Sequence, residues 1–220
     1  MSVWNLPALI DHTILRPDAT KADVLRLCRE ARDCGFTVIF VPPCYVDEAV
    51  EAVAGTTIRV GIPIGFPLGG HSTKAKVAEA VEAVAHGAHV LDMVLNVNRL
   101  KSGAHDSVRA DIAEVVRATP NVEHKVILET CYLTHEEKRT ACHLVVEAGA
   151  DYVKTSTGFG PAGATVEDVR LLKETVAGRV KVKASGGIRD WTTTLAMLEA
   201  GADRIGTSAG LKIFDEWRVG

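Results

Sequence analysis

Short apolar segments alternate with longer amphipathic segments along the whole chain, and this alternation limits the possible folds more than any other feature. β-Branched or apolar runs typical of buried strands occupy residues 8–10, 37–41, 58–62, 89–94, 124–128, 151–153, 179–182 and 204–205. Segments with helical periodicity occupy residues 21–34, 46–54, 74–86, 107–118, 135–148, 166–177, 192–200 and 208–217. Strict alternation requires a parallel sheet with crossover helices, and eight such units fit a closed barrel better than an open sheet. The sequence therefore predicts an α/β protein with a single (β/α)8 TIM barrel and a short N-terminal extension.

The composition is that of a globular protein. The 220 residues are 47% hydrophobic and 24% charged, and no linker divides them, so we expect residues 1–220 to form a single domain. The formal net charge of −3 does not supply the basic face of a nucleic-acid-binding protein. No apolar run predicts a membrane span, and the first residues lack the features of a secretory signal. The five scattered cysteines indicate free thiols, and we expect a cytoplasmic protein.

Four predicted helices end in glycine, as expected where a helix C-terminus needs a left-handed residue. These glycines, each followed by a predicted strand, are Gly87, Gly149, Gly178 and Gly201. The residues five positions further on are Asp92, Lys154, Lys183 and Gly206. The count predicts four equivalent positions, and the carboxyl ends of the strands form the active-site face of this fold. An acid, two lysines and a glycine are therefore expected around one barrel mouth.

Alternation within the strands predicts which way these side chains point, because neighbours project to opposite faces. Leu91 and Met93 are expected to face the helices, which directs Asp92 toward the barrel axis. The same pattern directs Lys154 and Lys183 inward. A lysine that points into a barrel is not explained as a solvated surface charge, and its burial is costly. These side chains are therefore candidates for a functional role.

Two lysines on neighbouring strands suggest amine chemistry. Burial and a nearby cation both lower the pKa of a lysine, and only the neutral amine attacks a carbonyl. Lys154 and Lys183 are interpreted as a Schiff-base nucleophile and its activating cation, with Asp92 available for proton transfer. The alternative is that each lysine pairs with a barrel carboxylate such as Asp92 or Glu129.

Glycines after the last two predicted strands favour an anion site. Gly186 and Gly187 follow one strand, and Gly206 and Ser208 follow the next. In such barrels the loops after strands seven and eight often bind phosphate, because backbone N–H groups and a helix N-terminus approach the ligand there. The alternative is that these residues are ordinary turn glycines.

Two other kinds of site are weakly indicated. Residues 158–163 match the dinucleotide pattern GxGxxG, but Pro161 removes a backbone donor from that turn. Lys183 stands near the position where an acidic ribose ligand is expected. Of the histidines, only His12 and His71 are expected to reach the mouth, and two histidines alone make a poor zinc site. We expect no metal and no cofactor.

Several segments resemble one known family. They are residues 9–13, 65–69, 91–94, 100–103, 129–131, 153–159, 182–189 and 204–208. In these segments the chain resembles the deoxyribose-phosphate aldolases, a family of class I aldolases with the TIM-barrel fold. The resemblance covers nearly the whole chain, and the segments around the two lysines are the most specific.

The resemblance implies roles for individual residues. Lys154 matches the Schiff-base lysine, Lys183 the residue that lowers its pKa, and Asp92 the proton donor and acceptor. Asp11 and Thr13 resemble residues near the substrate, although Asp11 is also consistent with an anchor for the first strand.

The substrate-binding set also includes Gly158 in the loop after the sixth predicted strand. Two departures from the family pattern concern the phosphate side of the site. Phe159 stands where one branch of the family has a lysine, and Ala209 stands where a second serine often follows Ser208. The expected consequence is a reduced affinity for phosphate.

The resemblance implies reversible cleavage of 2-deoxy-D-ribose 5-phosphate to D-glyceraldehyde 3-phosphate and acetaldehyde. The partners would be a small phosphosugar and an aldehyde, and the resemblance suggests a homodimer or a larger homo-oligomer. Two alternatives remain open, namely a non-catalytic sugar-phosphate-binding barrel and a metal-dependent phosphosugar aldolase or isomerase.

Overall fold

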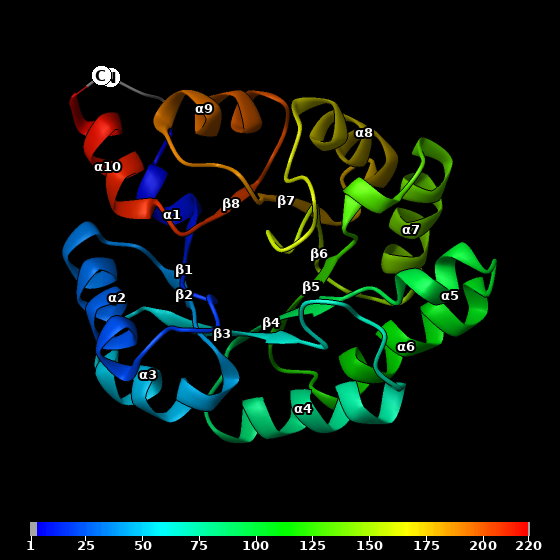
Figure 1. Ribbon diagram of the computed structural model, residues 1–220, viewed down its shortest axis with the longest axis horizontal. Coiled ribbons are helices and arrows are strands. Elements are labelled where there is room, and N and C mark those ends of the chain that lie inside the picture. The colour runs from blue at the N-terminus through cyan, green and yellow to red at the C-terminus, as the bar shows by residue number, and fades with distance from the viewer. Residues whose placement is uncertain (1–3, 220) are drawn as a thin grey trace.

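The computed structural model describes residues 4–219, which form a closed barrel of parallel strands surrounded by helices (Figure 1). Within these residues the hydrogen-bonded order of the strands follows the sequence, and β8 pairs with β1 to close the barrel. The strands are β1 (Ile10–Thr13), β2 (Val38–Phe40), β3 (Arg59–Ile64), β4 (Val90–Val94), β5 (Glu123–Ile127), β6 (Tyr152–Lys154), β7 (Lys181–Ser185) and β8 (Arg204–Thr207). The predicted (β/α)8 TIM barrel is confirmed.

The helices begin and end at recognisable signals. Thr20 and Thr134 form capping boxes at the starts of α2 and α7, and the four glycines predicted to end helices all adopt positive φ angles. The helices are α1 (Leu6–Leu9), α2 (Lys21–Cys34), α3 (Val46–Ala52), α4 (Thr73–Ala85), α5 (Val97–Lys101), α6 (His105–Ala118), α7 (His135–Glu147), α8 (Val166–Val176), α9 (Trp191–Glu199) and α10 (Gly210–Val219). Among the described helices, none is both long and apolar enough to cross a membrane.

Three differences from the predicted elements concern the first strand, an additional helix and the seventh strand. Residues 8–10 are not the first strand, because residues 6–9 form α1 and β1 begins at Ile10. Pro7 lies in the first turn of α1, where its fixed φ favours a helix. The short helix α5 was not predicted, and it begins where the Asn96 side chain accepts a hydrogen bond from the N–H of Arg99. Strand β7 extends to Ser185, so Lys183 lies inside the strand.

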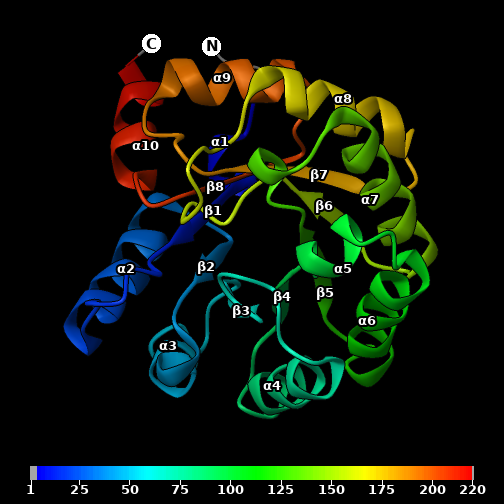
Figure 2. The ribbon, with the colours of Figure 1, turned by 45° about the vertical axis from the view of Figure 1, so that its right-hand side comes forward.

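The predicted N-terminal extension corresponds to α1, which packs against α10 (Figure 1). Figure 2, in which the molecule is turned by 45°, shows the helices lying outside the strands.

The strand ladder places the two lysines opposite each other. Lys154 of β6 pairs with Lys183 of β7, and parallel partners project to the same side of the sheet. Gly206 of β8 pairs instead with Ser185, two residues beyond Lys183. Asp92 of β4 pairs with Lys125, which pairs with Tyr152, two residues before Lys154. The prediction of four equivalent positions is therefore correct for the lysine pair and wrong for Asp92 and Gly206.

The space between strands and helices differs from the space inside the barrel. Outward-facing residues such as Ile62, Leu91 and Val153 are fully buried in one large apolar cluster. Inside the barrel, the apolar cluster is small and consists of Val38, Phe40 and Val90. The remaining interior is charged, and its buried ionisable residues are Asp11, Asp92, Lys125, Lys154, Lys183 and Arg204.

Candidate active site

Lys154 ends β6, and its side chain lies on the wall of a cavity of about 460 Å³. The cavity is at the C-terminal ends of the strands, where the loops that follow β1, β6, β7 and β8 meet. The Lys154 side chain is 6% exposed, and its Nζ donates a 2.7 Å hydrogen bond to Oδ2 of Asp92 on β4. A lysine amine is thus held nearly out of water at the point where the cavity meets the barrel interior.

Asp92 also binds the second lysine. Nζ of Lys183 is 2.7 Å from the same Oδ2 of Asp92 and 2.5 Å from Oδ2 of Asp11 on β1. The other oxygen of Asp11, Oδ1, accepts a 2.7 Å hydrogen bond from Nε of Arg204. The two lysines therefore share one carboxylate, and Lys183 has a second carboxylate that it shares with Arg204.

These contacts shift the pKa values of the two lysines in opposite directions. Burial lowers the pKa of Lys154 to about 8, aided by the charge of Lys183 and opposed by Asp92. Burial acts on Lys183 as well, but Asp11 and Asp92 outweigh it and raise the pKa of Lys183 above its ordinary value. Burial favours protonation of Asp92, yet Lys154, Lys183 and Lys125 hold the pKa of that carboxyl below its ordinary value. One amine can therefore lose its proton near neutral pH beside another that stays charged.

Phe40 fills the centre of the barrel beside the lysines. Its ring centroid is 4.0 Å from Nζ of Lys183, 5.6 Å from Nζ of Lys154 and 5.5 Å from Nζ of Lys125. A methyl group at Gly61 would lie 2.5 Å from the end of this ring, so the ring depends on a glycine there. The aromatic face attracts the ammonium groups and keeps water from the space between them.

The cavity collects most of the residues predicted to bind substrate. Those that line it are Thr13, Gly158, Gly186, Gly187, Gly206 and Ser208, together with Lys154. Asp11 has a different position from the one expected, because its fully buried carboxylate is not on the cavity wall and contacts Lys183 and Arg204. Asp92 and Lys183 lie just beneath the cavity, each 1% exposed.

The glycine loops approach each other so closely that side chains would not fit. A methyl group at Gly163 would lie 2.2 Å from the carbonyl oxygen of Gly186. Gly186 and Gly187 both have positive φ angles, which leaves the chain free to turn between β7 and α9. Arg189 lines the same cavity and forms no ion pair among the described residues. This end of the cavity therefore offers backbone groups and one free cation, a combination suited to an anion.

Glu129 supports the β6 loop and was not assigned this role from the sequence. It lies two residues after the end of β5 and has a left-handed φ of 54°. Its carboxylate accepts hydrogen bonds from the backbone N–H of Thr157, at 3.2 Å, and from the Thr157 hydroxyl. The predicted alternative of a lysine–carboxylate pair is thus realised at Asp92 and not at Glu129. An acidic residue in a strand-to-loop turn was the available signal for this contact.

Lys125 and Arg204 are two further interior cations that the sequence analysis missed. Lys125 is fully buried on β5, and Arg204 begins β8. Alternation along the strands was the available signal, because Lys125 has the same inward parity as Glu123 and Ile127.

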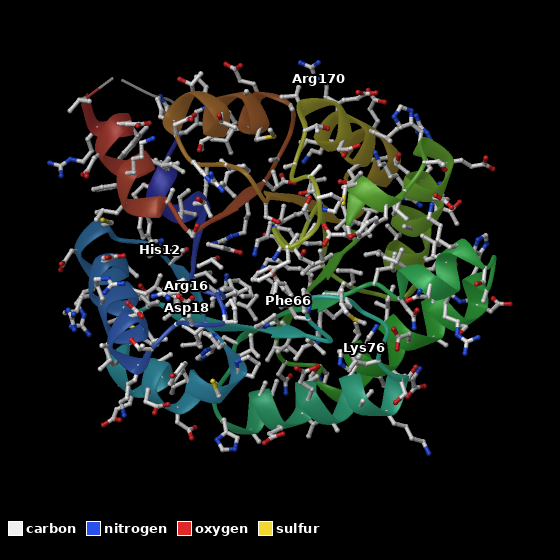
Figure 3. All side chains as sticks on the ribbon, in the orientation of Figure 1. His12, Arg16, Asp18, Phe66, Lys76 and Arg170 are labelled. Carbon is white, nitrogen blue, oxygen red and sulfur yellow. The ribbon has the colours of Figure 1, made fainter. Side chains whose placement is uncertain are left out.

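Of the two histidines expected at the mouth, His12 lines the cavity and His71 does not. His12 lies on the side of the barrel near α2 (Figure 3), where its Nε2 is 2.8 Å from Oε2 of Glu30, and burial lowers its pKa. His71 is exposed and is not among the cavity residues. Within residues 4–219, no three His, Cys, Asp or Glu side chains converge in an arrangement that could hold a metal ion.

Comparisons with known proteins identify the family. Residues 7–216 match the model described as DeoC/LacD family aldolase. A deoxyribose-phosphate aldolase of Caldanaerobacter subterraneus subsp. tengcongensis is 53% identical over 220 residues, covering 99% of this chain and 95% of the relative. A deoxyribose-phosphate aldolase of Brevibacillus brevis is 54% identical over 209 residues, covering 95% of each chain.

Solved structures give the same result. The chain superposes on the tetrameric deoxyribose phosphate aldolase of Aeropyrum pernix with a TM-score of 0.91 and 33% identity, covering 97% of this chain and 91% of that one. A structure described as QR15, an aldolase, has a TM-score of 0.94 and 45% identity, covering 98% and 96%. From the family match over most of its length and from these relatives, the chain belongs to the DeoC/LacD family of aldolases.

Proposed function

We propose that this chain is a class I aldolase that reversibly cleaves 2-deoxy-D-ribose 5-phosphate to D-glyceraldehyde 3-phosphate and acetaldehyde. The curated relatives named above are deoxyribose-phosphate aldolases. The observation that carries the proposal is the buried Lys154 amine beside the cavity, with a pKa of about 8. At pH 7 roughly one such amine in ten is neutral, against about one in 2,500 at the ordinary lysine pKa.

In this proposal Lys154 is the nucleophile. Its neutral Nζ attacks the aldehyde carbon C1 of the open-chain sugar, and the carbinolamine loses water to form a protonated Schiff base. The iminium accepts the electron pair of the C2–C3 bond as that bond breaks, and the C3 hydroxyl loses its proton. Glyceraldehyde 3-phosphate leaves, and the enamine on Lys154 is protonated at C2 and hydrolysed to acetaldehyde.

Asp92 is assigned to proton transfer. Its Oδ2 is 2.7 Å from Nζ of Lys154, so it can take up and return protons while the carbinolamine forms and dehydrates. Its second oxygen, Oδ1, has no hydrogen-bond partner among the described residues, which leaves an acceptor free for a proton or a water molecule.

Lys183 is assigned to activation, and Asp11 acts through it. The charge of Lys183 disfavours a second charge on Lys154, which keeps part of the Lys154 population neutral. Asp11 holds Lys183 at 2.5 Å and stabilises its charged form. In this assignment Asp11 is a positioning residue, whereas Thr13 lines the cavity within reach of the substrate.

The phosphate is assigned to the glycine end of the cavity. Gly186 and Gly187 precede α9, Gly206 and Ser208 precede α10, and Gly158 faces them from the β6 loop. Backbone N–H groups and the N-terminal ends of helices favour negative charge. Arg189 adds a cation, and Phe159, which is 50% exposed on the same wall, adds none.

Reduction of the Schiff base tests the proposal. Borohydride added with acetaldehyde is expected to fix a two-carbon adduct on the peptide that contains Lys154. A label on another peptide, or fully active enzyme without label, contradicts the assignment. A coupled dehydrogenase assay for released acetaldehyde separates catalysis from simple binding of the pentose phosphate. Activity that persists in a chelator separates the proposal from a metal-dependent aldolase or isomerase.

We further propose that residues 1–220 act as one barrel domain in the cytoplasm and that the chain forms a homodimer or a larger homo-oligomer. The pairing of β1 with β8 closes the barrel within a single chain and supports the first point. The related structure from Aeropyrum pernix is described as tetrameric, which supports the last. Sedimentation velocity of the purified protein tests the oligomeric state, and a monomer at all concentrations contradicts it.

A further inference from the structure

Lys125 is a fully buried cation beneath the lysine pair, and the mechanism above does not use it. Its Nζ is 2.5 Å from Oε1 of Glu123, two residues earlier on β5. The same Nζ is 3.8 Å from Oδ1 of Asp92 and 3.8 Å from Oδ2 of Asp11. Lys125 is therefore hydrogen-bonded to Glu123 and stops short of the two carboxylates that hold Lys183.

Lys125 does not hydrogen-bond to Oδ1 of Asp92, and this affects Lys154 because Lys154 binds the same carboxylate. Oδ1 of Asp92 is buried without a hydrogen-bond partner among the described residues, and Lys125 is the cation beside it. Oδ2 of the same carboxylate holds Lys154. An ammonium group that moved onto Oδ1 would take part of the negative charge that now stabilises protonated Lys154.

The other charged groups of the barrel interior are nearly balanced. The charged or titratable residues that the strands direct inward are Asp11 on β1, Arg59 on β3, Asp92 on β4, Glu123 and Lys125 on β5, Tyr152 and Lys154 on β6, Lys181 and Lys183 on β7, and Arg204 on β8. Arg59 and Lys181 lie at the far opening, where Arg59 binds Glu123 and Lys181 is exposed. Apart from Arg59 and Lys181, the carboxylates of Asp11, Asp92 and Glu123 equal in number the cations Lys125, Lys183 and Arg204. A charge on Lys154 is then the one without a matching anion.

We propose that Glu123 and Lys125 are positioning residues that set the protonation of Lys154 from the opposite end of the barrel. Lys125 supplies the third interior cation, which disfavours a charge on Lys154. Glu123 holds that cation toward the far opening, which leaves Asp92 free to bind Lys154 through Oδ2. The inference rests on the proposed function, because it describes how the same nucleophile is tuned.

The pair can be altered without touching the substrate. Neither Glu123 nor Lys125 lines the cavity that contains Lys154. Glu123 instead lines a second cavity of about 560 Å³ at the N-terminal ends of β5, β6 and β7, and its side chain is 18% exposed. A change at Glu123 is therefore expected to leave the substrate contacts intact.

The two residues are expected to act in opposite directions. In Lys125→Met the repelling cation is lost, so Lys154 holds its proton more tightly. The acid limb of the pH profile of kcat/KM should then move upward by about half to one pH unit. In Glu123→Gln the ammonium of Lys125 is released toward Oδ1 of Asp92, so Lys154 loses its proton more easily. The same limb should move downward.

The experiment measures two quantities from pH 6 to 10 in the full chain. One is kcat/KM for cleavage of 2-deoxyribose 5-phosphate, and the other is the rate at which borohydride traps the acetaldehyde adduct. The matched controls are Lys138→Met and Asp168→Asn, which break a buried 2.5 Å lysine–carboxylate pair between α7 and α8, outside the barrel. Both controls should keep the wild-type pH profile. Lys125→Arg should restore most of the profile, because it restores the charge.

Shifts of opposite sign in Lys125→Met and Glu123→Gln support the proposal. Unshifted limbs, shifts of the same sign, or equal shifts in the controls overturn it. If Lys125→Met does not fold, Glu123→Gln alone decides, and an unshifted or raised limb in that variant overturns the proposal. The acetaldehyde adduct of the wild type distinguishes failure of the proposed function from failure of the role given to Glu123 and Lys125. Its absence refutes the proposed function, whereas an adduct with unshifted profiles refutes only the role of Glu123 and Lys125.

Discussion

Lys154 and Lys183 direct their side-chain nitrogens at the same atom, Oδ2 of Asp92, each at a distance of 2.7 Å. The difference between the two lysines comes from their other contacts. Lys183 has Asp11 as a second carboxylate, whereas Lys154 is the lysine that opens onto the cavity. Lys154 and Lys183 are direct partners in the strand ladder, but their different contacts give their amines different pKa values.

Asp92→Asn is expected to slow both adduct formation and turnover and to move the acid limb of adduct formation to lower pH. The substitution removes the anion that stabilises protonated Lys154, so the pKa of Lys154 should fall below about 8. Loss of the proton carrier should slow borohydride trapping with acetaldehyde and should slow cleavage by about 100-fold or more. The measurement is the pH dependence of the trapping rate and of kcat in one preparation. A trapping rate equal to that of the wild type at high pH would contradict the role of Asp92 in carbinolamine formation.

Lys183→Met is expected to move the acid limb of kcat/KM upward. Without the neighbouring cation, Lys154 keeps its proton to higher pH, so the loss of activity should be greatest near pH 6 and smaller near pH 9. Lys76→Met is the matched control, because Lys76 is equally buried but pairs with Asp111 outside the barrel. Figure 3 shows Lys76 away from the barrel axis, toward α4 and α6. Near-normal rates in Lys183→Met from pH 6 to 9 would contradict the activating role.

Asp11→Asn is expected to destabilise the fold. The substitution leaves Lys183 and Arg204 without their shared carboxylate, and the loss of one partner from a buried ion pair costs about 3–5 kcal/mol. Urea denaturation at pH 7 measures the free energy of unfolding. Asp18→Asn is the control, since Asp18 is exposed and should change little. An Asp11→Asn protein as stable as the wild type would show that the ion pairs contribute nothing net.

Protonation of Asp11 at low pH should lower the stability of the wild-type protein. Contacts with Lys183, Lys125 and Arg204 hold the pKa of Asp11 well below its ordinary value, although burial acts in the opposite direction. A lowered native pKa contributes stability that is present above the unfolded pKa, near 3.9, and is lost as the pH falls toward the native value. Unfolding free energies should therefore decline below about pH 4, and Asp11→Asn should show a smaller decline over that range.

Phe159→Lys is expected to strengthen binding of the phosphate. Phe159 is half exposed on the cavity wall beside the glycine loops, and its ring meets Phe66 edge-on at 5.3 Å. A lysine there adds a second cation near Arg189, so KM for the phosphorylated sugar should fall while KM for unphosphorylated deoxyribose stays unchanged. The gain should shrink at high salt. Phe159→Leu is the control, and an equal change in both substrates would argue against a phosphate contact.

Local rules in the sequence predicted much of this site. Counting five residues from the glycines that end two helices predicted that Lys154 and Lys183 are equivalent positions in the strands. Alternation within the strands predicted that both side chains point inward. The contacts of Lys125 and Asp11 were not predictable in the same way. They join strands far apart in the chain, and which carboxylate each cation meets depends on how the closed barrel staggers its strands.

Short and isolated features were the least predictable. Helix α1 spans four residues, too few to show helical periodicity, and a single proline was its main signal. The Glu129–Thr157 contact joins two loops, whose relative position follows from tertiary packing and not from any repeat in the sequence.

Phe40 and Gly61 share the space at the barrel centre, so the size of the residue at one position limits the size at the other. A larger residue at 61 would require a smaller one at 40, because even a methyl group would overlap the ring. A smaller residue at 40 would leave three ammonium groups around an empty space that solvent could enter. Solvent would raise the local dielectric constant and weaken the fields that distinguish one lysine from the other. In the proposed mechanism, the difference in charge between Lys154 and Lys183 therefore depends on a hydrocarbon ring that takes no part in the chemistry.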